Sequence, residues 1–213
     1  IAEGGYTGLV KAIATEPEEV VDTIENSGLR GRGGAGFPTG RKWRIARAVE
    51  TDGKIVICNG DEGDPGAYMD RTILESNPHQ LLEGLAICAY GVGADQAIIY
   101  VRAEYPLAVE TMKQAIKSAE DLSLLGSAIL GTSFNLEVSV FQGSGAFVCG
   151  EETALIQSVE GKRGMPQYRP PYPVEKGLWG RSTIVNNVKT LSSVPSIITK
   201  GAEWFRAIGT ESS

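Results

Sequence analysis

Histidine and cysteine are scarce in this sequence of 213 residues. His79 is the only histidine, which excludes His-rich metal sites. The three cysteines, Cys58, Cys88 and Cys149, lie far apart in the chain and form no C-x-x-C pair. They make neither a disulfide framework nor a metal site by themselves, and this usage fits a reducing cytosol. We therefore expect a cytoplasmic protein.

Long apolar runs are also missing. The most apolar stretch, Leu81–Ala94, is interrupted by Glu83 and by glycines, so no run approaches the ~18 residues that a membrane-spanning helix needs. We expect no direct membrane insertion. The chain begins at Ile1 without a basic region or a signal-peptide pattern. The missing initiator Met and the end at Ser213 suggest a piece of a longer polypeptide.

Positive charge is in the minority, and it is unevenly placed. The formal net charge is −6, which argues against a nucleic-acid partner. The segment 26–49 nevertheless contains no acid and six bases, which are Arg30, Arg32, Arg41, Lys42, Arg44 and Arg47. A solvated helix face accounts well for Arg44 and Arg47. It accounts less well for Arg30 and Arg32, which stand among glycines, so this basic island predicts a local anion site.

The apolar pattern predicts alternating strands and helices. Strands are expected at Lys54–Cys58, Gln96–Val101, Phe134–Phe141 and Ser182–Val185. Helices are expected at Pro17–Glu25, Thr39–Glu50, Pro78–Tyr90, Pro106–Asp121 and Glu151–Glu160. This order predicts an α/β fold, a Rossmann-like three-layer domain with a mainly parallel sheet and right-handed crossovers. We expect the domain to span residues 1–191, with 192–213 as a helical edge that leads towards a C-terminal part absent from this chain.

A glycine-rich loop, Gly31–Gly36, lies inside the basic island. It matches G-x-G-x-x-G, but a helix precedes it instead of a strand, which argues against a standard dinucleotide fingerprint. Its glycines let the backbone approach a ligand closely. Arg30, Arg32 and the N-terminus of the following helix offer positive potential to a phosphate. A flexible surface loop is the alternative interpretation of this segment.

Other polar, glycine-rich segments follow predicted strands. Residues 59–66 follow the first strand, residues 143–152 follow the third and open a helix, and Asn186-Asn187 follow the last. Ligands of open α/β sheets bind at the carboxyl ends of strands, so we expect these segments to converge on one crevice. The carboxylates within 61–64 suit a divalent cation, or the hydroxyls and ring N–H of a ligand, or a plain acidic turn. The proline- and glycine-rich segment 161–180 is expected to be a long loop lying over another part of the fold.

Four motifs together resemble one family. They are SGLRGRGGAGFPTGRKW at 27–43, CNGDEGDPGAYMDR at 58–71, GEETALIQSVEG at 150–161 and IVNNVKTL at 184–191. The family is the NADH-oxidising flavoprotein (FMN) subunit of respiratory complex I. Relatives occur in NAD-reducing and electron-bifurcating hydrogenases and in NAD-dependent formate dehydrogenases. The resemblance covers essentially the whole chain, and four motifs in the same order make it highly specific.

The resemblance implies an FMN/NADH-binding domain in which hydride passes directly from NADH to FMN. No side chain is then catalytic, while Glu152 orients NADH and selects it. The FMN would be held by Gly31, Arg32, Gly33, Lys42, Asn59, Asp61, Gly150, Glu151, Asn186, Asn187 and Thr190. The NADH would stack over the flavin beside Phe37, Glu62, Asp64, Phe147 and Glu152. No metal site is implied here, because the family's 4Fe–4S cluster belongs to the C-terminal part that this chain lacks.

The implied partners are iron–sulfur subunits of a multisubunit hydrogenase, formate dehydrogenase or complex I-like assembly, which take electrons singly from the flavin. Gly63 and Asp64 stand where complex I subunits usually carry Ser and Glu. The GDPGA form at 63–67 therefore looks more like the soluble hydrogenase and formate dehydrogenase relatives. Phe147 stands where many relatives carry Tyr, which removes a hydroxyl contact to the cofactor.

Two other functions stay open at this point. One is a non-catalytic NAD-sensing or scaffolding module that binds a nucleotide without flavin. The other is a flavin-free Rossmann dehydrogenase, which is disfavoured because no strand precedes the glycine loop and no catalytic His, Tyr-x-x-x-Lys or Cys site is present. Flavin absorbance of the purified protein separates the first alternative from an FMN enzyme.

Overall fold

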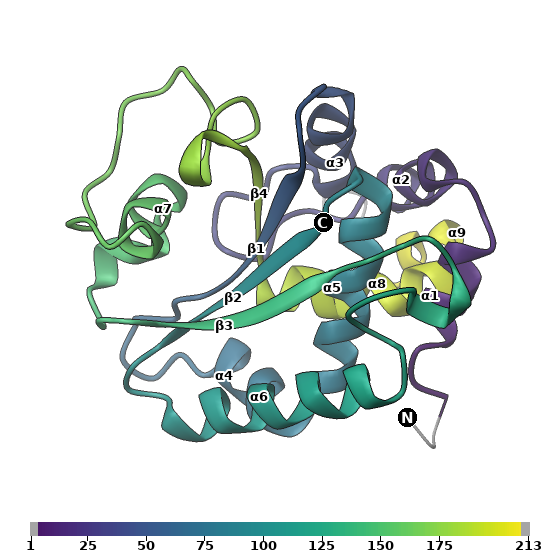
Figure 1. Cartoon of the computed structure of the whole chain (residues 1–213), viewed down its shortest axis with the longest axis horizontal. Helices are drawn as coiled ribbons and strands as arrows, with labels where there is room; N and C mark the ends of the chain where they lie inside the picture. The colour runs from purple at the N-terminus through teal and green to yellow at the C-terminus, as the bar shows by residue number, and fades with distance from the viewer. Residues whose placement is uncertain (1–3, 210–213) are drawn as a thin grey trace.

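A parallel four-stranded sheet forms the centre of the fold in residues 4–209, the part of the chain that the computed structural model describes (Figure 1). The strand order is β3-β2-β1-β4. The strands are β1 Lys54–Gly60, β2 Gln96–Arg102, β3 Glu137–Gly143 and β4 Ser182–Asn187. The α-helices are α1 Thr7–Ile13, α2 Pro17–Asn26, α3 Thr39–Ala48, α4 Met69–Ser76, α5 Pro78–Val92, α6 Pro106–Asp121, α7 Glu152–Val159, α8 Val188–Lys200 and α9 Ala202–Arg206. The predicted α/β fold with a parallel sheet is confirmed.

Both faces of the sheet are buried at β1 and β2, which explains why these strands read as continuous apolar runs. Val56 and Cys58 of β1 face a large core that includes residues of α5 and α8. Ile55 and Ile57 face a smaller core that includes Leu155 and Ile156 of α7. The sheet is thus the middle of three layers, with α7 covering the second face (Figure 1).

The strand order places a switch point between β1 and β4. From β1 the chain moves to β2 and β3 on one side of the sheet, whereas β4 pairs with β1 on the other side. In this register Cys58 lies beside Asn186, and Asn59 lies beside Asn187. A crevice opens at the carboxyl ends of strands where the connections diverge in this way, so the fold itself selects the place for a ligand.

Two helices, α4 and α1, were not predicted, because the carboxylates that hold their first turns lie outside these helices, seven or more residues away in the sequence. The Glu62 carboxylate accepts hydrogen bonds from the N–H groups of 69–71 at the start of α4. The Glu83 carboxylate accepts a hydrogen bond at 3.1 Å from the Leu9 N–H in the first turn of α1. Caps that come from other segments leave no local signature of a helix start.

The boundary expected after residue 191 falls inside α8. Asn187 caps this helix, because its Oδ1 accepts hydrogen bonds from the N–H groups of Lys189 and Thr190. Residues 188–200 therefore form one helix, and its later half is buried in the main core. The expected helical edge consists of this half and α9, and residues 210–213 lie outside the described part. Within residues 4–209, none of the helices has the length and apolar character that crossing a bilayer requires.

Candidate functional site

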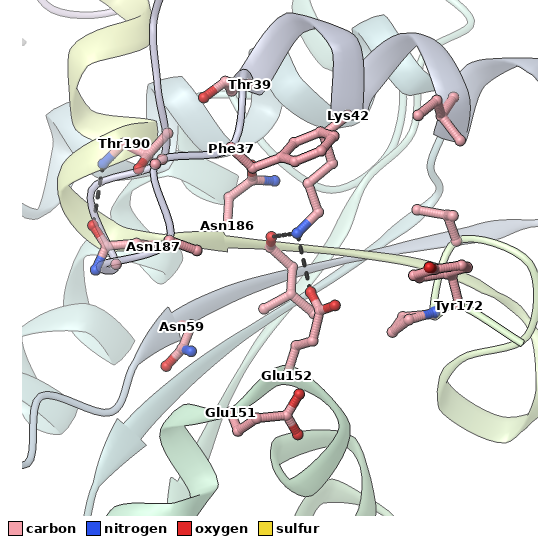
Figure 2. A pocket seen from close by; sticks show the side chains of 18 of the residues that line it. Phe37, Thr39, Lys42, Asn59, Glu151, Glu152, Tyr172, Asn186, Asn187 and Thr190 are labelled. Carbon is pink, nitrogen blue, oxygen red and sulfur yellow. Dashed lines mark hydrogen bonds and ion pairs between the residues drawn. The ribbon is translucent and has the colours of Figure 1, made fainter. Parts of the chain in front are cut away.

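A cavity of about 670 Å³ opens at the carboxyl ends of β1 and β4 (Figure 2). Its size lies within the range of ordinary small-molecule sites. Most of the residues that the sequence predicted for FMN and NADH line it together, namely Gly31, Gly33, Phe37, Lys42, Asn59, Gly150, Glu151, Glu152, Asn186, Asn187 and Thr190. The convergence expected of the segments that follow the strands is therefore present around a single cavity.

The glycine loop is closed at its base by backbone hydrogen bonds. Arg30 and Pro38 form an antiparallel bridge, and the Gly31 N–H donates to the Phe37 carbonyl at 2.9 Å. The helix α3 begins directly after this closure at Thr39, whose hydroxyl oxygen is buried without a hydrogen-bond partner. The loop and the start of α3 therefore form one wall of the cavity.

The tip of the glycine loop rests on the N-terminus of α8. The Arg32 N–H donates to Thr190 Oγ1 at 2.9 Å. Gly33 lies against Asn187 so closely that a Cβ at position 33 would be 3.3 Å from the Asn187 Cβ. The Arg32 side chain itself is exposed and does not line the cavity. A side chain at 33 would thus disturb both the loop and the cap of α8.

The basic island divides into two groups. Arg44 forms ion pairs with Glu18, Asp22 and Glu25 of α2, and Arg47 forms one with Glu18. These two arginines lie on the predicted helix face of α3, but that face is only partly solvated, because its ion pairs join α3 to α2. Within residues 4–209, Arg30 and Arg32 have no ion-pair partner, and with Lys42 they supply the positive charge near the loop.

An ion network crosses the cavity. The Lys42 Nζ donates to the Val185 carbonyl at 2.7 Å and lies 3.1 Å from Glu152 Oε2 (Figure 2). The other oxygen of Glu152 lies 2.8 Å from Arg169 Nη1, and Arg169 also reaches Glu151 at 3.2 Å. Both oxygens of Glu152 are therefore held by cations from opposite walls.

Glu151 lines the cavity and also caps the N-terminus of α7. Its Oε2 accepts hydrogen bonds from the N–H groups of Thr153 at 2.9 Å and Ala154 at 3.1 Å. It is thus the N-cap of α7, a position that favours a carboxylate. The cap fixes the start of α7, and with it the adjacent Glu152.

The asparagines of the site connect the segments that follow different strands. Asn59 Nδ2 donates to the Gly150 carbonyl at 2.9 Å, which joins the end of β1 to the segment after β3. Asn186 is buried, and its Oδ1 accepts a hydrogen bond from Trp43 Nε1 of α3 at 3.4 Å. These amides fix the walls of the cavity relative to one another.

Asp61 borders the cavity without lining it. Its Oδ1 lies 3.2 Å from Arg102 Nη1, and its Oδ2 is buried without a hydrogen-bond partner. A Cβ on Gly150, which does line the cavity, would lie 3.4 Å from that Oδ2. Burial raises the pKa of Asp61 to about 6, although the charge of Arg102 lowers it. The sequence did not single out Arg102, whose signal is a charge that ends an otherwise apolar strand.

Three residues predicted to lie beside NADH do not line the cavity. Glu62 caps α4 with its carboxylate. Asp64 is exposed, and Phe147, which is 70% exposed, lies next to Gly63. In the described part of the chain, no three His, Cys, Asp or Glu side chains are grouped as a metal site. The acidic turn at 61–64 thus directs Asp61 to Arg102 and Glu62 to the start of α4, while Asp64 is exposed.

The loop 161–180 supplies lining residues that the sequence did not identify individually. It was expected to lie over another part of the fold, and it contributes Arg169, Tyr172, Pro173, Val174 and Glu175 to the cavity. Tyr172 is 51% exposed and Phe37, on the glycine-loop side, is 45% exposed. The cavity therefore offers aromatic faces together with charged and amide groups, a combination that suits a planar, polar ligand with an anionic end.

Similarity to known proteins agrees with this site. Residues 24–196 match the family model described as the Nuo51 FMN-binding domain. The chain is 53% identical over 213 residues to HndC, a subunit of the NADP-reducing hydrogenase of Solidesulfovibrio fructosivorans, a match to 100% of this chain and 43% of that protein. It is 52% identical over 210 residues to a subunit of the NADH-quinone oxidoreductase of Aquifex aeolicus, a match to 98% of this chain and 49% of that protein.

Solved structures show the same fold. A crystal structure of an NAD⁺-reducing NiFe-hydrogenase in the H₂-reduced state matches with a TM-score of 0.88 and 41% sequence identity. The match covers 98% of this chain and 35% of the chain in that crystal structure. The present chain thus spans about half the length, or less, of the proteins that it matches.

Proposed function

Because the chain belongs to the family of the Nuo51 FMN-binding domain, we propose that it binds FMN in the cavity between β1 and β4 and transfers hydride to it from NADH. One observation carries the proposal. Segments that are far apart in the sequence, and that resemble the family's FMN- and NADH-binding motifs, line one cavity at the switch point of the sheet.

The chemistry of the cavity fits FMN. The glycine loop, with Arg32 and Lys42 nearby, suits the phosphate, because side chains are absent where the backbone must approach the ligand. Thr39, which lines the cavity, has a buried hydroxyl oxygen without a partner in the described residues. Such atoms are uncommon in folded proteins, and a polar group of a flavin would satisfy it.

When bound, FMN supplies the chemistry that the chain lacks, since it accepts hydride from NADH and releases electrons one at a time. The chain itself binds and orients the reactants and needs no acid or base for the transfer. Phe37 and Tyr172 offer aromatic faces to the nucleotide. Lys42 and Arg169 hold the Glu152 carboxylate at the cavity, where it orients NADH.

The electron acceptors are proposed to be iron–sulfur subunits of a cytoplasmic assembly of the hydrogenase or formate dehydrogenase type, in preference to membrane complex I. Three observations support this choice. HndC is named as a hydrogenase subunit, a matching crystal structure is that of an NAD⁺-reducing NiFe-hydrogenase, and residues 63–67 have the GDPGA form. The NADH-quinone oxidoreductase relative from Aquifex aeolicus is nearly as similar, so a complex I-like assembly is the second candidate. The 4Fe–4S cluster of such proteins is expected outside these residues.

Purified protein is expected to carry one FMN and no FAD. The reason is that the single basic glycine loop offers room for one phosphate group. Acid precipitation followed by chromatography of the released flavin identifies it, and absorbance gives the flavin-to-protein ratio. Recovery of FAD would contradict the assignment. Protein that binds NADH but no flavin would instead support the nucleotide-sensing alternative.

A further inference from the structure

Asp70 is a buried carboxylate next to the proposed FMN site that the site itself does not explain. It lies in the first turn of α4 and is 4% exposed. No ion pair to it is present in residues 4–209. Its Oδ2 accepts a hydrogen bond from Asn187 Nδ2 at 2.6 Å, and its Oδ1 has no partner. A buried carboxylate without an ion pair destabilises the fold. Its presence therefore indicates a role other than stabilising the protein.

Asn187, whose side chain donates to Asp70, is held at both ends of its amide. Asn187 Oδ1 accepts the N–H groups of Lys189 at 2.9 Å and Thr190 at 3.3 Å, while Nδ2 donates to Asp70. If the amide turned over, its NH₂ would face these N–H groups and its oxygen would face the carboxylate. A carboxylate only accepts hydrogen bonds, whereas a neutral amide or acid can pair with either orientation. The charge of Asp70 therefore stabilises the same orientation that the N–H groups of Lys189 and Thr190 favour.

The start of α8, where the Asn187 amide lies, is linked to the cavity and the glycine loop through two contacts. Asn187 and Thr190 both line the cavity. Gly33 packs against the Asn187 side chain, and the Arg32 N–H donates to Thr190 Oγ1 at 2.9 Å. A continuous series of contacts thus runs from α4 through the start of α8 to the tip of the glycine loop.

We propose that Asp70 is a positioning residue of the FMN site, whose carboxylate holds Asn187, the start of α8 and the glycine loop in the arrangement that binds the cofactor. Asp70 does not itself line the cavity. This inference rests on the proposed function, because it assumes that the cavity binds FMN.

The proposal gives FMN binding a pH dependence. Burial, and then the negative charge of Glu62, raises the pKa of Asp70 to about 6, while Asn187 and Lys189 lower it. The buried Cys58 thiol also faces this carboxylate. Above pH 6 the ionised carboxylate fixes the Asn187 amide. Below pH 6 the carboxyl is neutral and holds the Asn187 amide less strongly, so the affinity for FMN should fall.

Asp70→Asn tests the role with a side chain of nearly the same shape. The Kd of the flavin-free protein for FMN, measured by quenching of flavin fluorescence, should rise about tenfold at pH 8, because hydrogen bonds to charged groups are the stronger ones. At pH 5 the variant and the wild type should bind FMN about equally. The ratio of the Kd of the variant to the Kd of the wild type, taken at each pH, cancels the effects of the titration of the FMN phosphate and of Asp61. Glu75→Gln, on the same helix but paired with Arg71, is the matched control and should leave the Kd unchanged.

A Kd ratio that is near one at pH 8, or equally high at both pH values, would overturn the positioning role while FMN binding by the wild type stands. A wild type that binds no FMN would overturn the proposed function as well. If the variant fails to fold, an NMR titration of the wild type tests the proposal instead. The side-chain NH₂ resonances of Asn187 are expected to shift with a midpoint near pH 6, and resonances that stay constant from pH 5 to 8 would refute the proposal.

Discussion

Gly33→Val is expected to abolish stoichiometric FMN binding while the fold is kept. A Cβ at this position would lie 3.3 Å from the Asn187 Cβ, and the two methyl groups of valine extend further. The loop would have to leave the start of α8, and with it the cavity wall. Overpacking typically costs about 1–3 kcal/mol, whose upper part corresponds to roughly a hundredfold in Kd. The position is exposed and outside the main core, so the free energy of unfolding should fall by no more than this cost and the fold should be kept.

The measurements for Gly33→Val are the FMN content of the purified protein and its thermal unfolding without flavin. Gly91→Ala is the control, because a Cβ there meets its neighbours at ordinary distances of 3.5 Å or more and lies in α5, outside the cavity. It should retain FMN. If Gly33→Val still holds one FMN per chain, the glycine loop is not the flavin site.

The predicted strands and the fold class depended on short-range signals. The strands β1 and β2 are apolar runs between turn residues, and their burial on both faces makes those runs continuous. The edge strand β3 instead alternates between buried and exposed positions along much of its length. The helices α1 and α4 were not predicted because carboxylates outside the helices, those of Glu83 and Glu62, hold their first turns. A pattern that covers a few neighbouring residues cannot contain such caps.

The site could be located from the sequence, but its electrostatics could not. The polar segments converge because the carboxyl ends of parallel strands share one edge of the sheet. The assignment of FMN to those segments came from the resemblance to a family. Arg102 and Arg169 were not foreseen, since their partners, Asp61 and Glu152, become neighbours only in the fold. Glu62 was expected near NADH, yet its carboxylate is engaged by the start of α4.

The pairing of Glu152 bears on the choice between NADH and NADPH. The 2′-phosphate of NADPH carries about −1.5 to −2 charges at pH 7, by analogy with other phosphomonoesters. A unit negative charge ~5 Å from a carboxylate costs about 3 kcal/mol at an effective dielectric constant of 20. Lys42 and Arg169 pair with Glu152 and compensate part of this repulsion. Half of the repulsion still corresponds to about a tenfold preference for NADH.

Glu152→Gln is therefore expected to raise kcat/KM for NADPH about tenfold, while the value for NADH stays within a few-fold. The change removes the repulsion and also frees Lys42 and Arg169 to face the added phosphate, so both effects act in the same direction. The measurement is kcat/KM for both nucleotides with ferricyanide as acceptor, at low and moderate salt. Glu175→Gln is the control, because Glu175 also lines the cavity but forms no ion pair in the described residues. An unchanged NADPH/NADH ratio in Glu152→Gln would show that selectivity lies elsewhere, and an equal change in Glu175→Gln would show that it depends only on the total charge of the cavity.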